Sequence, residues 1–306
     1  MGSSAFDVER LDATFGATVT GVNLVDIDDS LFAALRELWL EHALLVFPGQ
    51  FLTREQQIAF ARRIGPLEFD IAPLSNVMSD GSIRPDDDND DVVKVLKGNM
   101  GWHHDSTYMP VQAMGAVFTA EVVPDSGGAT GFADMRAAYE ALDEATLARI
   151  EGRVASHSLY HSQAMVGHDG EKGSHSAASA VATVDNSLEN SDDFGGYGFH
   201  DGPVSRRPLV KTHPETGRKN LLVGRHAYDV DGLSAQESEA LLRELVEFAC
   251  QSPRIYHHDW APGDAVLWDN RCLMHQATPW DMSQARIMWH SRIAGDPSTE
   301  SALLAS

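Results

Sequence analysis

The sequence predicts one domain of mixed α/β class that is mainly β, with helices flanking the strands. Short apolar runs bounded by glycine, proline and aspartate recur along the chain, which is typical of buried strands. Two capping boxes, Thr53 with Gln56 and Ser234 with Glu237, mark helix starts. A chain of 306 residues with 43% hydrophobic content can bury one large core. We therefore expect residues 1–306 to form a single domain.

The first part of the chain is expected to alternate strands with helices. Residues 13–24 alternate β-branched residues with glycine and predict a strand and a turn. Aspartate and serine then offer N-caps for a helix over 28–39, whose apolar spacing is helical. Residues 43–47 form a short apolar run stopped by Pro-Gly, and the first capping box opens a helix over 53–64 that ends at Gly-Pro.

The middle of the chain predicts a loop followed by strands. Residues 72–91 have the composition of a loop, and their acidic run 86–91 is interpreted as a solvated turn, because it lacks the ordered ligand alternation of a calcium loop. Residues 92–96 predict a strand, and 114–123 predict a core strand. Gly127-Gly128 is interpreted as a turn and not a phosphate cradle, since no Lys-Ser/Thr pair follows.

The remaining elements are two short helices capped by Asp134 and Asp143, two strands within 207–224, an amphipathic helix after Ser234, and a last core strand at 286–293.

Between these elements, residues 161–205 are rich in Gly, Ser, Asp, Asn and His and lack apolar periodicity. This composition predicts a flexible lid and not a second folded domain. Five histidines raise the alternative of a second metal site, but without fixed spacing or carboxylate partners they are interpreted as solvated or substrate-facing. They are His157, His161, His168, His175 and His200.

Charge and composition exclude several classes of protein. A formal net charge of −22 disfavours binding to nucleic acid or to an anionic membrane surface. The two cysteines are too few for a disulfide framework. Residues 1–10 lack the basic-then-apolar pattern of a signal peptide, and no apolar run approaches the length of a membrane span. We therefore expect a cytoplasmic enzyme with a small-molecule substrate. The oligomeric state stays open, a homo-oligomer included.

One polar motif stands out, at residues 101–106. His103 and Asp105 are two residues apart, so an extended strand would place both side chains on one face, where they could bind one metal ion. The best third ligand is His275, in an apolar run that starts at Ala265 after a Pro-Gly-Asp turn. Two imidazoles and one carboxylate with an open face are typical of non-haem Fe(II) oxygenases. A similar triplet, His257 to Asp259, is the alternative motif.

Two further residues extend this pattern: Thr130, 27 positions after His103, and Arg286, 11 positions after His275. With these spacings the chain resembles the taurine and chlorophenoxyacetate dioxygenase family, Fe(II) enzymes that use 2-oxoglutarate and O2. The resemblance covers nearly the whole chain. It implies a double-stranded β-helix, the cupin-like jelly roll, as the core that the helices flank.

The resemblance also implies roles for these residues. His103, Asp105 and His275 match the iron ligands, Thr130 the threonine that contacts 2-oxoglutarate, and Arg286 the arginine that pairs with its far carboxylate. The triplet at 257–259 is discounted, because Thr130 and Arg286 show the family's spacing relative to His103 and His275 and not relative to this triplet. The competing interpretations are a zinc hydrolase with the same ligands and a non-catalytic cupin-like binding protein.

Within the family, the runs 96–110 and 131–139 resemble the dioxygenases that cleave (S)-2-aryloxypropionates such as dichlorprop. That reaction would hydroxylate the ether-linked carbon and release a phenol and a 2-oxo acid, with succinate and CO2. His290 stands where taurine-cleaving members carry a second arginine, which makes a taurine-type sulfonate less favoured. The alternative substrates are a sulfonate, an alkyl sulfate or a natural aromatic acid. The expected substrate-binding residues are Lys97, Asn99, Arg207 and His290. Met100, Met109, Phe194, Tyr197 and Phe199 are expected to form the wall around the substrate ring.

Overall fold

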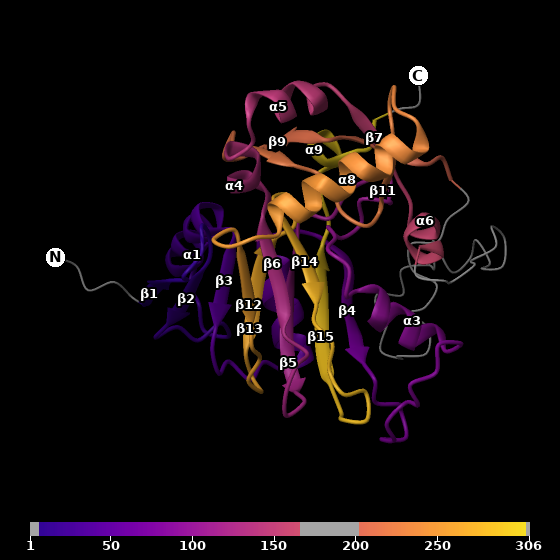
Figure 1. Ribbon diagram of the computed structural model, residues 1–306. Helices are drawn as coiled ribbons and strands as arrows, with labels where there is room; N and C mark the ends of the chain where they lie inside the picture. The colour runs from indigo at the N-terminus through magenta and orange to yellow at the C-terminus, as the bar shows by residue number, and fades with distance from the viewer. Residues whose placement is uncertain (1–5, 166–201, 304–306) are drawn as a thin grey trace.

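The computed structural model describes residues 6–165 and 202–303. Its largest element is a seven-stranded sheet with the strand order β1-β2-β3-β13-β5-β15-β4, antiparallel except where β2 pairs with β3 (Figure 1). Its strands are β1 (Asp7–Arg10), β2 (Ala17–Thr20), β3 (Leu44–Phe47), β13 (Ala265–Asp269), β5 (Gly115–Val122), β15 (Ile287–Ile293) and β4 (Leu67–Ser75).

A three-stranded antiparallel sheet, β12-β6-β14, packs against this large sheet. Its strands are β12 (Ile255–His258), β6 (Thr130–Asp134) and β14 (Leu273–Ala277). Phe132 and Leu273 of the small sheet share one buried cluster with Phe118, Trp268 and Met288 of the large sheet. The two sheets therefore enclose a core between them, as the two layers of a jelly roll do.

Two smaller sheets extend the small-sheet side. They contain β11 (Ala227–Val230), β7 (Val154–His157) and β8 (Ser205–Pro208), and the hairpin β9 (Val210–Thr212) with β10 (Lys219–Leu221).

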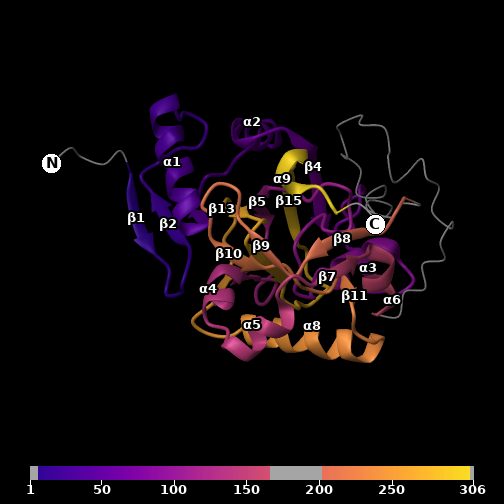
Figure 2. The same cartoon turned by 90° about the horizontal axis from the view of Figure 1, so that it is seen from above.

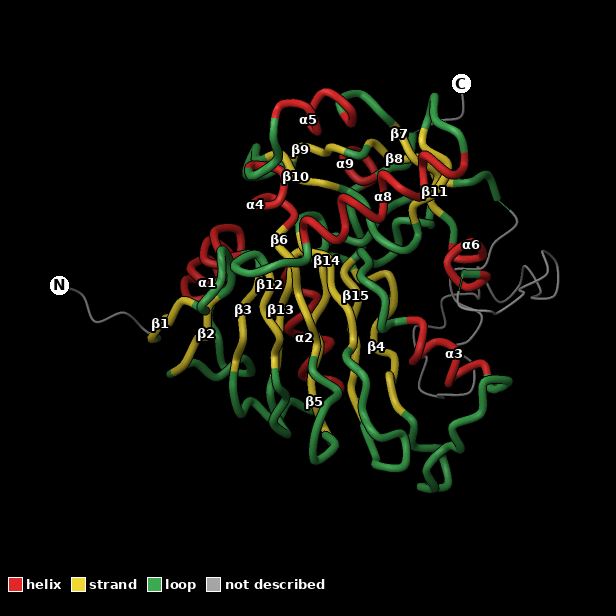
Figure 3. Tube along the Cα trace, in the orientation of Figure 1, coloured by secondary structure: helices red, strands yellow, loops and turns green. Residues whose placement is uncertain are grey.

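Helices cover both outer faces of this sandwich. Trp39 of α1 and Phe60 of α2 pack with Leu45, Val117 and Leu267 of the large sheet, whereas α4 and α8 pack against the opposite side. Seen from above, α2 and α8 lie on opposite sides of the strands (Figure 2), and α2 overlaps the strands of the large sheet in the view of Figure 3. The described helices are α1 (Asp29–His42), α2 (Arg54–Ile64), α3 (Asp91–Gly98), α4 (Met135–Glu140), α5 (Glu144–Ile150), α6 (Leu159–Ala164), α8 (Ala235–Ala249) and α9 (Pro297–Glu300).

Both predicted capping boxes are present, at the starts of α2 and α8. The strand predicted at 92–96 is wrong, because these residues belong to helix α3. The Asp90 carboxylate accepts hydrogen bonds from the N–H groups of Val92 and Val93 and so caps the helix. Val93 and Leu96 then bury one helical face, and this packing overrides the strand preference of a valine-rich run.

Two other expectations change in detail. The apolar run that carries His275 is two strands, β13 in the large sheet and β14 in the small sheet, because Asn270 to Cys272 turn the chain between them. Strand β4 begins before the predicted loop and continues into its first residues, up to Ser75.

The predicted lid lies mostly outside the described residues, together with His168, His175, His200, Phe194, Tyr197 and Phe199. Only its two ends are described, within α6 and at the start of β8. None of the helices in the described ranges is long and apolar enough to cross a membrane.

Candidate metal centre and cavity

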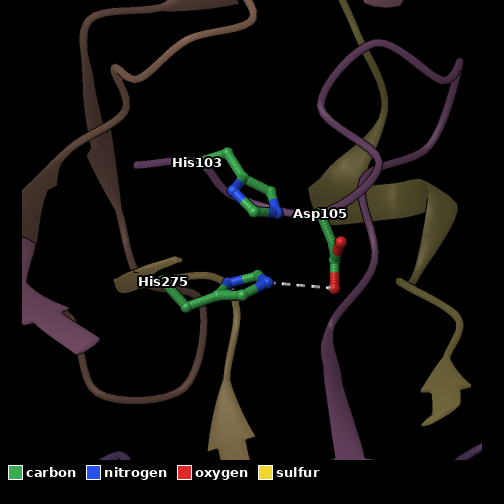
Figure 4. A group of neighbouring side chains, drawn as sticks. All are labelled: His103, Asp105 and His275. Carbon is green, nitrogen blue, oxygen red and sulfur yellow. Dashed lines mark ion pairs between the residues drawn. The ribbon is translucent and has the colours of Figure 1, made fainter. Parts of the chain in front are cut away.

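A backbone bridge brings His103 and His275 together. The N–H of His103 donates to the carbonyl of His275 at 3.0 Å, and the N–H of His275 donates to the carbonyl of His103 at 2.8 Å. His103 is held by this one bridge and not by the longer strand expected from the sequence, and a turn follows it. The 172-residue separation in the chain is therefore closed by two hydrogen bonds, which fix both imidazoles on one side (Figure 4).

The side chains of His103, Asp105 and His275 converge. One potential ligand atom from each lies within 4.8 Å of the other two, and His275 Nε2 is 3.6 Å from Asp105 Oδ2 (Figure 4). His103 Nδ1 lies 2.7 Å from the carbonyl oxygen of Gly101, which can only accept, so this nitrogen carries the proton. The lone pair of His103 is therefore on Nε2, the nitrogen available to a metal.

The two carboxylate oxygens of Asp105 differ in their hydrogen bonds. Its Oδ1 accepts a 2.8 Å hydrogen bond from Arg292 Nη2, whereas its buried Oδ2 has no hydrogen-bond partner among the described residues. Burial, the largest single influence, raises the pKa of this carboxyl group, but Arg292 and the neighbouring histidines together outweigh it, and the pKa is lowered. Asp105 therefore stays ionised and presents one free oxygen toward the two imidazoles.

The two histidines are uncharged at neutral pH. Burial lowers the pKa of His103 and of His275 well below the ordinary histidine value, and the neighbouring positive charges act in the same direction. Neutral imidazole is the form that binds a metal ion.

Asn270, in the turn after β13, holds the motif loop in place. Its side chain accepts from the N–H of Asp105 at 2.7 Å and donates to the carbonyl oxygens of Asp105 and Ala113. The Asn270 carbonyl accepts from His104 Nδ1 at 2.8 Å, which ties His104 to the turn after β13. Burial lowers the pKa of His104 to about 4, so this ring is a neutral part of the scaffold.

A cavity of about 990 Å³, including its open mouth, surrounds the three converging side chains. Its apolar walls come from Leu74, Val95, Leu96, Leu159, Phe118 and Trp280. Polar groups converge in it around His103 and Asp105, which is the usual form of a small-molecule site.

Thr130 and Arg286 both line this cavity, as the sequence predicts. Thr130 Oγ1 accepts a hydrogen bond from Trp260 Nε1 at 3.0 Å, and Arg286 lies 5.0 Å from the ring centre of Trp280. Burial lowers the pKa of Arg286 to about 10, so it stays charged at neutral pH, yet it forms no ion pair with any carboxylate in the described ranges. A buried guanidinium without an acidic partner is suited to a carboxylate ligand.

Gly128 makes room for Arg286. Gly127 and Gly128 both have positive φ, as a turn requires, and a Cβ on Gly128 would lie 3.2 Å from Arg286 Nε.

Two of the four expected substrate-binding residues lie elsewhere. Lys97 does not line the cavity and forms ion pairs with Asp86 and Asp88 at 2.7 and 2.6 Å. Arg207 is buried away from the cavity, where it donates to the carbonyl oxygens of Thr107, Met109 and Glu300. Both predictions are therefore corrected, because the basic groups are already engaged by carboxylates or by the backbone.

His290 and Asn99 do line the cavity. His290 Nε2 lies 3.6 Å from Asp105 Oδ2, and its ring stacks on Trp268. Burial, with a contribution from Arg292, lowers the pKa of His290 to about 3, so it is uncharged and cannot act as a cation for a substrate. The ring-wall residues Met100 and Met109 do not line the cavity.

The alternative motif does not form a metal site. Asp259 and His257 are exposed, while His258 is buried and pairs with Asp264 at 3.1 Å. In residues 6–165 and 202–303 the only second group of close ligand atoms is His213, Asp269 and Cys272. The acidic run at 86–91 forms none; it caps α3 and pairs with Lys97.

Sequence analysis missed Arg292, Arg225 and Gln163, which all line the cavity. Two signals were present. Arg292 is two residues after His290, so it lies on the same face of strand β15. Arg225 follows Gly224, whose φ of 124° favours glycine and marks a close approach of the backbone.

The comparison with known proteins agrees with this site. The model of the family "Taurine catabolism dioxygenase TauD, TfdA family" matches residues 7–292. The chain is 65% identical to the (S)-phenoxypropionate/alpha-ketoglutarate-dioxygenase of Sphingobium herbicidovorans, over 98% of this chain and 99% of that one. It is 54% identical to the protein of the same name from Delftia acidovorans, over 95% of this chain and 96% of that one.

The structure is also similar to the crystal structure of AAD-2 in complex with Mn(II) and N-oxalylglycine. The TM-score is 0.82 at 33% sequence identity, over 98% of this chain and 99% of that one. The predicted jelly roll with flanking helices is thereby confirmed. The chain belongs to the TauD, TfdA family and is an alpha-ketoglutarate-dependent dioxygenase.

Proposed function

We propose that this protein uses Fe(II), 2-oxoglutarate and O2 to hydroxylate the ether-linked carbon of an aryloxyalkanoate such as (S)-dichlorprop. The observation that carries the proposal is one cavity that holds two neutral imidazoles, a carboxylate oxygen and a buried arginine. Among the described residues, that oxygen has no hydrogen-bond partner and that arginine has no acidic partner. The 65% identical (S)-phenoxypropionate relative supports the substrate class.

The residues present fit an Fe(II) ion. His103 Nε2, His275 and Asp105 Oδ2 would be its ligands, and Arg292 on Asp105 Oδ1 would keep the carboxylate monodentate. The bound ion, with 2-oxoglutarate and O2, supplies the oxidant that breaks a C–H bond, and succinate and CO2 are formed. Manganese in the AAD-2 crystal structure supports a divalent ion in this family.

Arg286 would hold the far carboxylate of 2-oxoglutarate, and Thr130 would contact the same cosubstrate. The Arg286 guanidinium has two edges to offer a carboxylate fork, and burial beside Trp280 keeps water from competing. This clamp distinguishes the proposed dioxygenase from a zinc hydrolase or a binding protein, neither of which needs a second carboxylate site beside the metal.

The apolar walls of the cavity suit the aromatic ring of the substrate. A hydroxyl group placed on the carbon between the ether oxygen and the carboxylate makes a hemiketal. This intermediate breaks its bond to the aryloxy oxygen and releases a phenol and a 2-oxo acid, which is pyruvate when the substrate is a propionate.

A sulfonate or an alkyl sulfate is the second candidate substrate. His290 argues against a taurine-type sulfonate as the substrate, because its ring is uncharged and it stands where taurine-cleaving members carry an arginine. A cytoplasmic location and the absence of nucleic-acid or membrane partners stay predictions from charge and composition, and the oligomeric state stays open.

Two experiments test the proposal. Anaerobic addition of Fe(II) and 2-oxoglutarate should give a weak visible charge-transfer band, which is expected to be lost in His275→Ala. Absence of this band in the wild type, together with hydrolytic activity on zinc, would contradict the dioxygenase assignment.

The substrate is tested by incubating the Fe(II)-loaded protein with 2-oxoglutarate and, separately, (S)-dichlorprop, (R)-dichlorprop, taurine and an alkyl sulfate. We expect succinate and phenol in equal amounts from the (S) enantiomer. Succinate with taurine or the alkyl sulfate, but no phenol from either enantiomer, would defeat the aryloxyalkanoate proposal and leave the iron chemistry standing.

A further inference from the structure

The cavity contains a second cation, Arg225, that has no acidic partner among the described residues. The segment that carries it lies against the metal motif, since the N–H of Arg225 donates to the carbonyl of Trp102 at 2.9 Å. Gly224 permits this approach, because a Cβ there would lie 3.0 Å from the Trp102 oxygen and 3.3 Å from the Cα of His103. The chain therefore places Arg225 next to His103.

Two more glycines shape the path of this side chain. A Cβ on Gly101 would lie 3.1 Å from Arg225 Cδ, and a Cβ on Gly98 would lie 2.9 Å from Arg225 Nη1. The stem thus runs over the motif loop, and the guanidinium lies at the end of α3. Nη2 donates to the carbonyl of Ser162 in α6 at 3.0 Å, which orients the group without neutralising its charge.

Arg225 is charged and has no counter-ion in the described part of the chain. Burial lowers its pKa to about 10, which leaves it protonated at neutral pH. No ion pair joins it to a carboxylate of residues 6–165 or 202–303. A desolvated guanidinium that uses one hydrogen bond to a carbonyl keeps donors free for an anion.

The three arginines that line the cavity have different surroundings. Arg292 is bound to Asp105, and Arg286 lies beside Gly128 and Trp280. Arg225 lies at the α3 and α6 end of the cavity, beside Gly98 and Ser162. Asn99, Leu96 and Leu159 line the same cavity. In the proposed reaction, both the cosubstrate and the substrate are carboxylic acids that bind near the metal. Arg286 and Arg225, which have no acidic partner among the described residues, offer one guanidinium to each.

Gln163 gives a second, independent sign of a polar ligand at this end. It lines the cavity, it is 7% exposed, and its side-chain oxygen has no hydrogen-bond partner in the described ranges. A buried carboxamide oxygen without a partner is destabilising unless a ligand satisfies it. Rotation of the amide can present either its N–H2 group or its oxygen to such a ligand.

We propose that Arg225, assisted by Gln163, binds the carboxylate of the aryloxyalkanoate substrate. The apolar residues of α3 and α6 then contact its ring. This inference rests on the proposed function and replaces Lys97 and Arg207 as the anion-binding group.

The test compares Arg225→Gln and Arg225→Lys with the wild type, and uses Lys97→Gln as the matched control. Lys97 is also a cation at the C-terminal end of α3, but it is paired with Asp86 and Asp88 and does not line the cavity. For each protein the KM is measured for (S)-dichlorprop, for its uncharged amide and for 2-oxoglutarate, with bound iron as the check on folding.

In Arg225→Gln we expect the KM for (S)-dichlorprop to rise by about 30-fold or more, the loss typical of removing one partner of a buried charge pair. The KM for the amide and for 2-oxoglutarate should change by less than about 3-fold. The amide has no charge, and 2-oxoglutarate places its carboxylates away from the Arg225 end of the cavity. Arg225→Lys should recover part of the affinity for the acid, since it restores the charge but not the fork. Lys97→Gln should behave as the wild type.

An unchanged KM for the acid in Arg225→Gln, or an equal rise in KM for the acid and the amide, would overturn this inference. The proposed function would still stand if the wild type turns over (S)-dichlorprop. A wild type that forms no phenol from either enantiomer would overturn both.

Discussion

Among the described residues, two buried groups of three side chains contain a histidine and an aspartate at metal-binding distance. One is His103, Asp105 and His275, and the other is His213, Asp269 and Cys272; in each, the potential ligand atoms lie within 4.8 Å of one another. They differ in what their polar atoms already bind.

In the second group every potential ligand is engaged. Asp269 is bound by the Arg271 guanidinium at 2.8 and 2.6 Å and by His213 Nε2 at 3.0 Å. His213 Nδ1 accepts from the N–H groups of Glu215 and Thr216, so neither ring nitrogen has a free lone pair. Burial raises the pKa of the Cys272 thiol well above its ordinary value, so it stays protonated and is not a ligand.

In the first group Asp105 Oδ2 has no hydrogen-bond partner in the described part of the chain, and His103 Nε2 has its lone pair free. Proximity of ligand residues therefore does not separate a metal site from a structural ion pair. Unsatisfied lone pairs do, because burying them without a partner is unfavourable unless a ligand binds.

The largest effect should come from Asp105→Ala. Loss of the carboxylate ligand is expected to lower iron content and to reduce succinate formation to about a thousandth of the wild type or less. Asp259→Ala, in the exposed alternative motif, should keep wild-type activity. Metal analysis and a succinate assay on both variants measure this. An active Asp105→Ala beside an inactive Asp259→Ala would show that the metal motif was misidentified.

The next effect concerns stability and not activity. Asp269→Asn removes the fully buried ion-pair partner of Arg271 and leaves only the partly exposed Glu215, so it should lower the free energy of unfolding by about 3–5 kcal/mol. The iron content of the folded fraction should stay unchanged. Asp231→Asn, which breaks the exposed pair with Arg206, is the control and should change stability by about 1 kcal/mol or less. Iron loss in folded Asp269→Asn would mean that the second group contributes to metal binding.

A smaller effect separates the two arginines near the metal. Arg292→Gln removes the partner of Asp105 Oδ1 and should weaken metal affinity by roughly 10–100-fold, as is typical of residues that orient a ligand. Arg286→Gln should instead raise the KM for 2-oxoglutarate and leave metal affinity near the wild-type value. Metal titration and 2-oxoglutarate kinetics on both variants check this. Equal effects on both quantities in both variants would refute the division of roles.

The sequence was sufficient for the parts of the fold and site that depend on local signals. Helix α2 begins at the predicted capping box, and the strand at β3 stops at Pro-Gly, because caps and turns are decided by neighbouring residues. The convergence of His103, Asp105 and His275 could be expected, because the first two lie two positions apart in one motif and the family spacing pointed to the third.

The parts that failed depend on residues far apart in the chain. The helix at α3 was predicted as a strand, since its burial against Trp280 and Met282 could not be read from local preference. Lys97 was expected in the cavity, but its pairing with Asp86 and Asp88 depends on how the loop folds back. Arg225 was missed because only the approach of Gly224 to His103 brings it to the site.

The smallest expected effect concerns His157, which is buried like His213 but has no hydrogen-bond partner on either ring nitrogen within the described ranges. Burial lowers its pKa well below the ordinary value near 6.5, and Arg207 adds to this shift. Below about pH 6.5 the unfolded chain binds a proton that the folded protein does not bind, so stability falls as pH decreases, by up to about 1.4 kcal/mol per pH unit for this group. His157→Leu should remove this contribution, so the unfolding free energy should fall less steeply with acid than in the wild type. Urea unfolding between roughly pH 5 and 8, a range that brackets the ordinary histidine pKa, measures this. At the upper end of that range both forms are uncharged, and the difference between variant and wild type reports packing alone. A variant whose unfolding free energy declines with acid as steeply as that of the wild type would show that His157 takes up its proton in the folded state, as a histidine paired with a carboxylate would.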